Sequence, residues 1–476
     1  MNKHDFPKIH FYDQDFVDIY NKTWSWLSPY WIDPEKGEQD SNGFFIYPEN
    51  DNLILNQFES IMSSFFLVYS NRNFDSCKNI DYFYKQQEES GAIRWKYDIK
   101  TNQPILDKEN PEGVGLPLFA FAEFNLYHKS ANKRRIKEVM PTLQKYMDWL
   151  DKTFKQENGL YAAPVCASTM TNSPRENVVY PIDFNACMAI NANYMSALGD
   201  ILNDKDLIFQ YRKMYFSIKT KINNLMWDDE SGFYYDLDKD SNKIFTKTIA
   251  SYWTMLAEIP NVDKADCLVK HLNDPKSFGT EHPFPSLSAD DSHFSENGNG
   301  YNGSVFPAFN FMVIKGLEKY GQYEFARECA IRHLYFVLET LMPNDDKAVG
   351  DLYEAYLPNK EGKANMKGSS VLARPRYVLT VGLSTIALMI ENVIGLAISL
   401  PRKTVDWIIP NLEIMGIENL SLKRNLITIL SNKSTRGWEI QMESEKLYYF
   451  TINILGQKKK TLPIPSGKCS MLIDKL

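Results

Sequence analysis

The sequence predicts a mainly α-helical fold: an (α/α)₆ toroid of twelve helices followed by a small C-terminal antiparallel β domain. Apolar residues recur with a period near 3.6 in twelve segments, and twelve helices pair into six hairpins. After about residue 397 the apolar period falls to two, in short runs rich in β-branched and aromatic residues. The alternation of long and short loops between the helices favours a closed ring.

Each expected helix is an apolar-periodic segment bounded by turn-rich loops. The twelve segments are 13–28, 54–69, 76–89, 116–129, 133–156, 183–201, 204–226, 246–257, 262–272, 305–319, 322–343 and 372–394. Three of them begin beside a residue that can cap a helix N-terminus, namely Asp75, Asp183 and Asp204. The most apolar stretch, 377–400, is interrupted by Glu391 and is expected to be a buried helix that leads into a strand.

The loops separate a toroid from an open solenoid of helix pairs. A solenoid would show self-similarity at a period of about 34–47 residues, and the sequence has none. Loops after the odd-numbered helices are long and carry polar and aromatic residues, whereas those after the even-numbered helices are mostly short. Long loops at one end are what a ring with a ligand-binding mouth requires.

The C-terminal part is expected to form a separate β-sandwich-like domain. Alternating runs such as NLITILS and KLYYFTINILG are split by Asn, Gly and Lys turns. We therefore divide the chain into a helical domain over residues 1–396 and a β domain over residues 397–476, which we expect to cap the toroid.

Composition excludes several classes of function. Hydrophobic residues make up 44% of the chain and charged residues 24%, which are globular values, and a net charge of −7 argues against nucleic acid or an anionic membrane as partner. Neither a membrane span nor the apolar core of a signal peptide is visible. We expect a cytoplasmic protein, or a periplasmic or secreted one if a signal peptide has been removed.

Cysteine and histidine usage gives no sign of a metal site or of a disulfide framework. The six cysteines are scattered without a CxxC pair, and the seven histidines never cluster at ligand spacing. We expect free thiols, no metal and no cofactor, and the sequence leaves the oligomeric state open.

Candidate ligand contacts lie on the loops that would meet at the mouth. They are Gln57, Phe58, Glu59, Arg94, Trp95, Asp98, Asn172, Arg175, Tyr301, Asn302, Tyr356, Arg374 and Arg376. Several also have a structural explanation: Asp183 is as readily a helix cap as a ligand contact, and Glu59 suits the first turn of a helix. Glu354, set between two tyrosines in YEAYLP, is the hardest to explain structurally, because enclosure by aromatics favours a perturbed pKa.

The gathered acids, aromatics and arginines fit the hydrolysis of a glycoside. That reaction needs two carboxyl groups across the bond, one that gives a proton and one that activates water or attacks carbon. The sequence contains no GxSxG, no phosphate-binding glycine loop and no nicotinamide fingerprint.

Several motifs resemble those of the six-hairpin (α/α)₆ glycoside hydrolases, which include trehalases, mannosyl-oligosaccharide glucosidases and mannosylglycerate hydrolases. The resemblance covers most of residues 20–395. The motifs that carry it are IDYFYKQQEESGAIR (80–94), FGTEHPFPSLSADDSHF (278–294), GYNGSVFPAFNFMVIKGLEKYG (300–321) and YEAYLPNKEG (353–362). The resemblance implies an inverting mechanism with Glu354 as general base and with Glu59 in contact with a sugar hydroxyl.

The chain departs from the family pattern where the general acid is expected. The family loop reads Ser-Gly-Met-Asp-Asn-Ser-Pro-Arg, and residues 168–175 here read STMTNSPR, so Thr171 stands where the aspartate belongs. A Trp-Arg pair of the family is Tyr301-Asn302 here, and a second Trp is Phe306. The pocket is therefore rebuilt.

Three explanations for Thr171 stay open. The acid has moved, with Glu176, Asp183 or Asp98 as replacement. In the second explanation, the leaving group needs little protonation, or the substrate supplies its own acid. Arg374 and Arg376 would suit such a substrate if it is anionic. Or catalysis is lost and the protein only binds glycans. We expect an exo-acting, inverting hydrolase of an α-linked disaccharide, oligosaccharide or glycosyl conjugate; the alternatives are a degenerate glycan-binding protein and a sugar isomerase or lyase.

Overall fold

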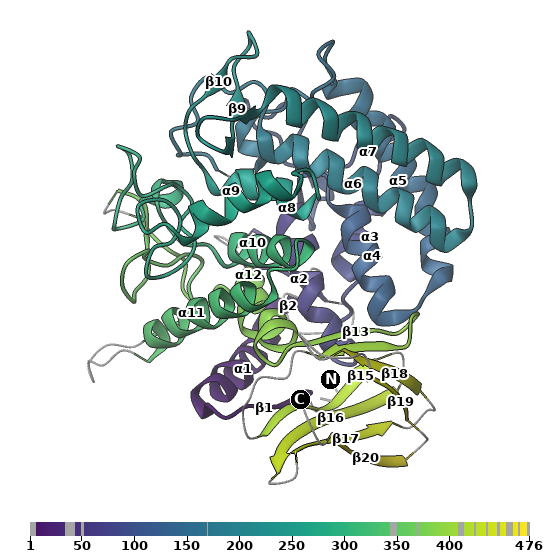
Figure 1. Cartoon of the computed structure of the whole chain (residues 1–476). Helices are drawn as coiled ribbons and strands as arrows, with labels where there is room; N and C mark the ends of the chain where they lie inside the picture. Colours follow the sequence, from purple (N-terminus) through teal and green to yellow (C-terminus); the bar gives the residue numbers. More distant parts are fainter. Residues whose placement is uncertain are drawn as a thin grey trace.

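The structure is a computed structural model of the whole chain, shown in Figure 1. The residues that it describes are 6–33, 43–48, 52–168, 170–342, 350–368, 371–407, 414–422, 425–434, 437–444, 448–453, 460–464 and 467–473. Thr169, in the loop that carries Thr171, lies outside the described residues.

The even-numbered helices form a closed inner ring. They are α2 (Gln57–Leu67), α4 (Phe119–Ser130), α6 (Ile182–Leu202), α8 (Trp253–Leu256), α10 (Pro307–Lys319) and α12 (Val378–Gly382). Each packs against the next in this order, and α12 packs against α2. The predicted toroid of twelve helices is confirmed within the described part of the chain.

The odd-numbered helices form the outer layer of the ring (Figure 1). They are α1 (Gln14–Leu27), α3 (Lys78–Lys85), α5 (Lys133–Phe154), α7 (Lys205–Leu225), α9 (Val262–Asn273) and α11 (Tyr323–Leu341). The helix α5 buries Ile136, Val139, Met140 and Leu143, the spacing of a single apolar stripe, whereas the inner helix α6 is buried almost all round. The outer helix α5 is therefore apolar on one side, whereas the inner helix α6 is apolar on nearly all sides.

Several predicted helix boundaries are wrong. Residues 54–56 form strand β4 (Ile54–Asn56), which pairs with β5 (Lys96–Asp98), so that α2 starts only at Gln57. The helix expected over 246–257 is a 3₁₀ turn (Ile249–Tyr252) followed by the four residues of α8. The helix expected over 372–394 begins at Val378 and continues from α12 as a π-helical segment, η6 (Leu383–Val393).

Of the three expected helix caps, one forms as predicted. The Asp204 side chain accepts hydrogen bonds from the backbone of residues 206 and 207 at the start of α7. The helix α3 begins later than expected, so Asp75 accepts only from the backbone N–H of Cys77, one residue before the helix. Asp183 lies inside the first turn of α6, whose N-cap is Pro181.

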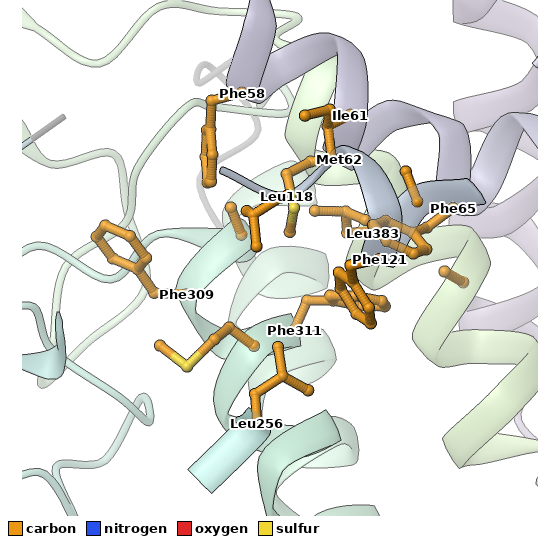
Figure 2. Packing of buried hydrophobic residues seen from close by; sticks show 14 of the residues in the cluster. Phe58, Ile61, Met62, Phe65, Leu118, Phe121, Leu256, Phe309, Phe311 and Leu383 are labelled. Carbon is orange, nitrogen blue, oxygen red and sulfur yellow. The ribbon is translucent and has the colours of Figure 1, made fainter. Parts of the chain in front are cut away.

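The interior of the ring is filled by apolar side chains from the inner helices (Figure 2). Phe58, Ile61, Met62 and Phe65 follow one another along α2 and meet residues of the other inner helices. The facing residues labelled in the figure are Leu118, Phe121, Leu256, Phe309, Phe311 and Leu383. Ile61 and Leu118 are fully buried, and Met62 is 1% exposed. The ring is therefore a packed core rather than an open channel.

The C-terminal β domain consists of two sheets that lie beside one end of the ring (Figure 1). The first sheet has the order β1 (Lys8–His10), β15 (Ile414–Leu422), β16 (Asn425–Ser434), β17 (Gly437–Ser444) and β20 (Gly467–Ile473). The second has the order β13 (Leu396–Ser399), β14 (Thr404–Trp407), β18 (Tyr448–Asn453) and β19 (Lys460–Ile464). All pairs in the two sheets are antiparallel except β14 with β18.

The N-terminal strand ties the two parts of the chain together. Residues 8–10 pair with residues 416–418, although the sequence division assigns them to the helical domain. Trp407, fully buried in β14, donates from its indole Nε1 to the backbone oxygen of Ile394 at 3.0 Å. The division at residues 396/397 stays a prediction, to which the structure adds this N-terminal strand.

Two global properties follow for the part of the chain that the structure describes. None of its helices combines the length and the apolarity that crossing a membrane requires. Its His, Cys, Asp and Glu side chains form no group of three or more that could hold a metal ion.

Candidate active site

Residues from five of the long loops, and from the starts of three inner helices, line one cavity at an end of the ring. The cavity has a volume of about 530 Å³. Its lining residues are Asn56, Phe58, Glu59, Trp95, Lys96, Asp107, Lys108, Glu109, Cys166, Thr171, Tyr301, Phe306, Ala308, Phe309, Glu354, Arg374, Tyr377 and Thr380. The structure thus brings together the predicted contacts Phe58, Glu59, Trp95, Tyr301, Glu354 and Arg374.

Glu354 and Arg374 are aligned by backbone pairing between their two loops. The N–H of Glu354 donates to the backbone oxygen of Arg374 at 3.1 Å. The Arg374 side chain returns two hydrogen bonds to the Glu354 carboxylate, from Nε to Oε2 at 2.7 Å and from Nη2 to Oε1 at 2.9 Å. Such a two-point contact fixes the plane of the carboxylate as well as its position.

Arg374 also reaches a second carboxylate of the cavity. Its Nη2 lies 3.8 Å from Oε1 of Glu59, and its guanidinium lies 4.1 Å from the centre of the Tyr377 ring. Burial alone would lower the pKa of Arg374, but Tyr377, Glu354 and Glu59 together raise it above its usual value. The guanidinium therefore stays charged between the two acids.

Glu59 is held by the start of α2 and by Tyr377. It lies in the first turn of α2, where the helix dipole favours a negative charge, and its backbone N–H donates to the Asn56 cap. The Tyr377 hydroxyl donates to Oε1 of Glu59. Burial, followed by the negative charge of Glu59, raises the pKa of Tyr377 well above its usual value, so that this hydroxyl remains a donor.

The loop that carries Thr171 reaches the cavity through Thr171, whereas Asn172 connects loops. Asn172 Nδ2 donates to the backbone oxygens of Asn299 at 3.0 Å and Met366 at 3.2 Å, and its Oδ1 accepts from the N–H of Tyr301 at 3.0 Å. The sequence predicts a ligand contact for Asn172, but its amide binds neighbouring backbone and it does not line the cavity.

Arg175 and Asp183 form a buried ion pair outside the cavity. Arg175 Nη2 lies 3.0 Å from Oδ1 of Asp183, and its Nε lies 2.8 Å from Oδ2 of Asp236, with all three side chains at most 2% exposed. The predicted ligand contact of Arg175 and the acid role of Asp183 are not supported by this placement. Both residues fix the loop to α6 and to the strand β9 (Asp236–Leu237).

Four further predicted contacts stabilise loops instead of lining the cavity. Arg94 pairs with Glu88 at 2.7 Å and Glu112 at 3.1 Å. The Asp98 carboxylate accepts from the backbone N–H groups of residues 100 and 101 and so closes a turn. Gln57 is buried and donates to the backbone oxygen of Leu116 and to the Tyr146 hydroxyl. The buried Tyr356 accepts from the N–H of residue 353.

The remaining predicted residues also lie outside the cavity lining. Arg376 is 63% exposed and lies 3.4 Å from the carboxylate of Asp351. Glu176 is exposed. Asn302 is partly buried, and its side-chain oxygen accepts no hydrogen bond from the described residues. Arg376 therefore does not join Arg374 as a second cation for an anionic substrate.

Sequence reasoning missed the far end of the second mouth-side loop. Asp107, Lys108 and Glu109 line the cavity, as does Lys96, whose ammonium lies 4.1 Å from the centre of the Trp95 ring. The predicted loop ends at Ile105, although turn residues continue as far as the expected helix start at 116. The stretch between residue 105 and the expected helix start at 116 could have indicated that this loop continues and supplies further side chains to the cavity.

The cavity can support acid–base chemistry on a neutral polar ligand. Four carboxyl groups line it, from Glu59, Asp107, Glu109 and Glu354, together with the cations of Lys96, Lys108 and Arg374. Aromatic rings of Phe58, Trp95, Tyr301, Phe306 and Phe309 supply apolar walls. Carboxyl groups that face aromatic walls suit a sugar, which has polar edges and apolar faces.

Comparison with known proteins agrees with this geometry. The chain is 54% identical, over the full length of both chains, to an uncharacterized protein of Borreliella burgdorferi strain B31. It is 23% identical to the periplasmic trehalase of Escherichia coli O8 strain IAI1 over 36% of this chain and 29% of the trehalase. The crystal structure of a GH63 mannosylglycerate hydrolase from Thermus thermophilus in complex with glucose superposes with a TM-score of 0.61, at 16% identity, over 77% of this chain and 99% of that one.

Two domain families match the chain in consecutive segments. Residues 395–476 match the trehalase C-terminal domain. Residues 77–366 match the mannosylglycerate hydrolase MGH1-like glycoside hydrolase domain, which accounts for more than half of the chain. The chain therefore belongs to the MGH1-like family of glycoside hydrolases.

Proposed function

We propose that this chain is an inverting, exo-acting hydrolase of an α-linked disaccharide, oligosaccharide or glycosyl conjugate, with Glu354 as the general base. The observation that carries the proposal is the Glu354 carboxylate, fixed by Arg374 at 2.7 and 2.9 Å within a cavity that holds further carboxyl groups. Inversion needs a base on one side of the anomeric carbon and an acid on the other, about 6.5–9.5 Å apart.

Arg374 suits Glu354 to the role of base. The Arg374 guanidinium holds the Glu354 carboxylate in one plane through its two hydrogen bonds. A carboxylate has about four acceptor positions, so Glu354 can bind Arg374 and still accept a proton from water. That water attacks the anomeric carbon while its proton passes to Glu354.

The closed floor of the cavity supports exo-action. Phe58 lines the cavity, and two turns further along α2 Phe65 lines a different space at the other end of the ring. Ile61 and Met62 lie between them on the same helix and are buried in the core (Figure 2). A cavity that is closed below receives the end of a glycan and does not let a chain pass through.

The aromatic walls and the relatives support a carbohydrate ligand. The ring of Tyr301 stacks on Phe306 with centroids 4.7 Å apart, which gives a broad apolar surface beside the acids. The hydrolase from Thermus thermophilus that shares this fold is seen in complex with glucose. The relative from Escherichia coli is, by its name, a trehalase.

The isomerase or lyase alternative has less support, because the paired histidines of the chain lie away from the cavity. His282 Nε2 and His333 Nδ1 are 2.6 Å apart, and both rings are fully buried. Burial lowers the pKa of His333 to about 3 and that of His282 well below its usual value. Neither residue lines the cavity.

The proposal is tested by supplying α-linked disaccharides, glycosyl-glycerates, α-aryl glycosides and α-glycosyl fluorides, and by following the first product with proton NMR. Glu354→Gln is the test variant. Glu361→Gln, an exposed residue of the same loop, is the matched control. We expect the β-anomer from the wild type and from the control. Loss of the base should lower kcat on every substrate, by roughly 10²–10⁴-fold.

Two outcomes would contradict the proposal. Retention of the α-anomer would assign a nucleophile in place of a base. Absence of turnover on all substrates, together with a rise in Tm on adding a sugar, would instead support a glycan-binding protein, the alternative that Thr171 favours.

A further inference from the structure

The cavity lacks a carboxyl group at the position where the family carries its acid. Thr171 lines the cavity there, and a hydroxyl does not donate a proton at a useful pKa. Asp183, considered as a replacement, is buried against Arg175, and Glu176 is exposed outside the cavity lining. If the chain is a hydrolase, as proposed above, another group must protonate the leaving oxygen of an ordinary glycoside.

Two of the four carboxyl groups in the cavity are poorly suited to that task. Glu354 and Glu59 both lie against the Arg374 guanidinium, at 2.7 Å and 3.8 Å. Arg374 donates two hydrogen bonds to the Glu354 carboxylate, and the Tyr377 hydroxyl donates to that of Glu59. A general acid, by contrast, must carry a proton of its own and turn it toward the leaving oxygen. The remaining candidates are Asp107 and Glu109.

A rigid turn holds these two residues at the edge of the cavity. Asn110, fully buried directly after Glu109, donates from Nδ2 to the backbone oxygen of Val114 at 2.8 Å and accepts from the Val114 N–H at 3.0 Å. Its own N–H donates to the backbone oxygen of Asp107 at 3.0 Å. Arg94 braces the same turn, because its Nη1 donates to the backbone oxygen of Glu112 at 2.6 Å.

Glu109 lies beside the segment that leads to Thr171. The Cys166 thiol, which also lines the cavity, is 3.8 Å from the backbone oxygen of Glu109. Burial raises the pKa of this thiol, and the negative charge of Glu109 raises it further, more strongly than that of Asp107 does. Through this backbone contact Glu109 borders the segment that leads to the loop where the family acid is missing, and its side chain lines the same cavity as Thr171.

We propose that Glu109 is the general acid of the hydrolysis and takes the role that the family gives to the aspartate at the position of Thr171. The carboxyl group of Glu109 gives its proton to the glycosidic oxygen as the bond from that oxygen to the anomeric carbon breaks. Water forms the new bond to the anomeric carbon and gives a proton to Glu354. Glu109 regains a proton from solvent and Glu354 releases one, so that the net change is the addition of one water.

The inference rests on the proposed function and is tested by varying the leaving group. An alkyl or sugar leaving group needs a proton, whereas fluoride leaves with little assistance. The substrates are α-glucosyl and α-mannosyl fluoride, with methyl glycosides and disaccharides of the same sugars. The variants are Glu109→Gln and, for the competing carboxyl group of the same turn, Asp107→Asn. Glu176→Gln, at an exposed residue outside the cavity lining, is the control. All three positions are exposed, so the variants should fold, and their Tm values verify this.

We expect Glu109→Gln to lower kcat on the alkyl and sugar glycosides by roughly 10²–10⁴-fold and on the fluorides by less than about 10-fold. Asp107→Asn should lack this selective loss, and Glu176→Gln should stay close to the wild type on both substrate classes. Equal losses on both substrate classes, an unchanged Glu109→Gln enzyme, or the selective loss in Asp107→Asn would overturn the assignment to Glu109.

The two proposals fail in different ways. If the wild type cleaves the fluorides but no alkyl or sugar glycoside, the hydrolase and its base stand and the assignment of Glu109 is refuted, because no acid acts. If the wild type cleaves neither class, the proposed function is refuted, and the role of Glu109 with it.

Discussion

Arg374 binds the carboxylate of Glu354 with two side-chain hydrogen bonds of 2.7 and 2.9 Å and places its other face over the ring of Tyr377. The cation is thereby enclosed by a carboxylate and an aromatic ring, and 30% of its side chain remains exposed. This contact links the loop of residues 351–362 to the start of α12, and it sets the orientation of the proposed base.

Replacing Arg374 should impair catalysis more than folding. Arg374→Lys keeps the charge but cannot make the two-point contact, so we expect kcat to fall roughly 10- to 100-fold through misplacement of Glu354. Arg376→Lys, two residues away on the surface, is the matched control and should stay within about twofold. Steady-state kinetics on the best substrate measure both. An Arg374→Lys enzyme as active as the control would show that the orientation of Glu354 does not depend on this pair.

Asn172 should hold the rim of the cavity together. Asn172→Ala removes the bonds to Asn299, Met366 and Tyr301 and should destabilise the local structure by about 1–3 kcal/mol. Faster amide hydrogen exchange in residues 297–303 and 365–367 is the expected readout, together with a raised KM. Glu176→Gln in the same loop should change neither. Unchanged exchange in Asn172→Ala would mean that these segments are held by other contacts.

The buried group of Arg175, Asp183 and Asp236 should matter for stability. Asp236→Ala leaves the Arg175 charge with one partner fewer and should lower the free energy of unfolding by about 3–5 kcal/mol. Exposed Glu138→Gln, which breaks the surface pair with Arg134, should leave the free energy of unfolding nearly unchanged. Urea unfolding compares the two.

A variant of Asp183, in the same buried ion-pair cluster, distinguishes a structural role of this residue from a catalytic one. Asp183→Asn should lose stability but keep most of its activity per folded molecule, because Asp183 does not line the cavity. If fully folded Asp183→Asn protein instead turned over substrate roughly 10²-fold more slowly, Asp183 would be restored as a candidate acid.

Stability should fall on acidification through Glu391. Burial would raise the pKa of this carboxyl group, but Lys315 at 2.9 Å and Lys129 at 3.3 Å, with a hydrogen bond from Tyr69, lower it to about 2. A carboxyl group whose pKa is lower in the folded state stabilises the fold above its unfolded pKa of about 4.5. That stabilisation should disappear as the pH falls from about 5 to 2.

Glu391→Gln tests this contribution. We expect lower stability than the wild type at pH 7, since Lys315 loses a partner, and a smaller loss between pH 5 and 2. Thermal unfolding across this range measures it, with Glu138→Gln as the surface control. A pH dependence identical to the wild type would assign the acid sensitivity to other carboxyl groups.

The layout of the ring could be predicted from the sequence because it depends on local periodicity. The all-round apolarity of α6 and the single stripe of α5 already separate an inner from an outer helix. A helix boundary was predicted wrongly where pairing with a distant segment overrides the local apolar period. Residues 54–56 read as the start of a helix but extend as a strand, because they pair with residues 96–98.

The candidate site was predicted only in part. Glu354, Glu59 and Trp95 were predicted because they lie on mouth-side loops, and Glu354 lies in a motif of the family as well. Glu109 was missed because a charged residue in a turn is ordinarily solvated, and only its neighbours Asn110 and Cys166 show that this turn borders the cavity. The sequence carries no direct signal for that proximity.

The sequence by itself determined the ring of helices, the β domain and the loops that supply the site, because helix and strand periods are local properties. The tertiary structure decided which loop side chains face the ligand. Arg374 and Arg376 are two residues apart, yet the first binds Glu354 in the cavity and the second Asp351 at the surface. Arg175 was equally suited to a ligand, but Asp236, far along the chain, holds it in the interior. A loop side chain points toward the partner that stabilises it most, and the folded chain supplies that partner.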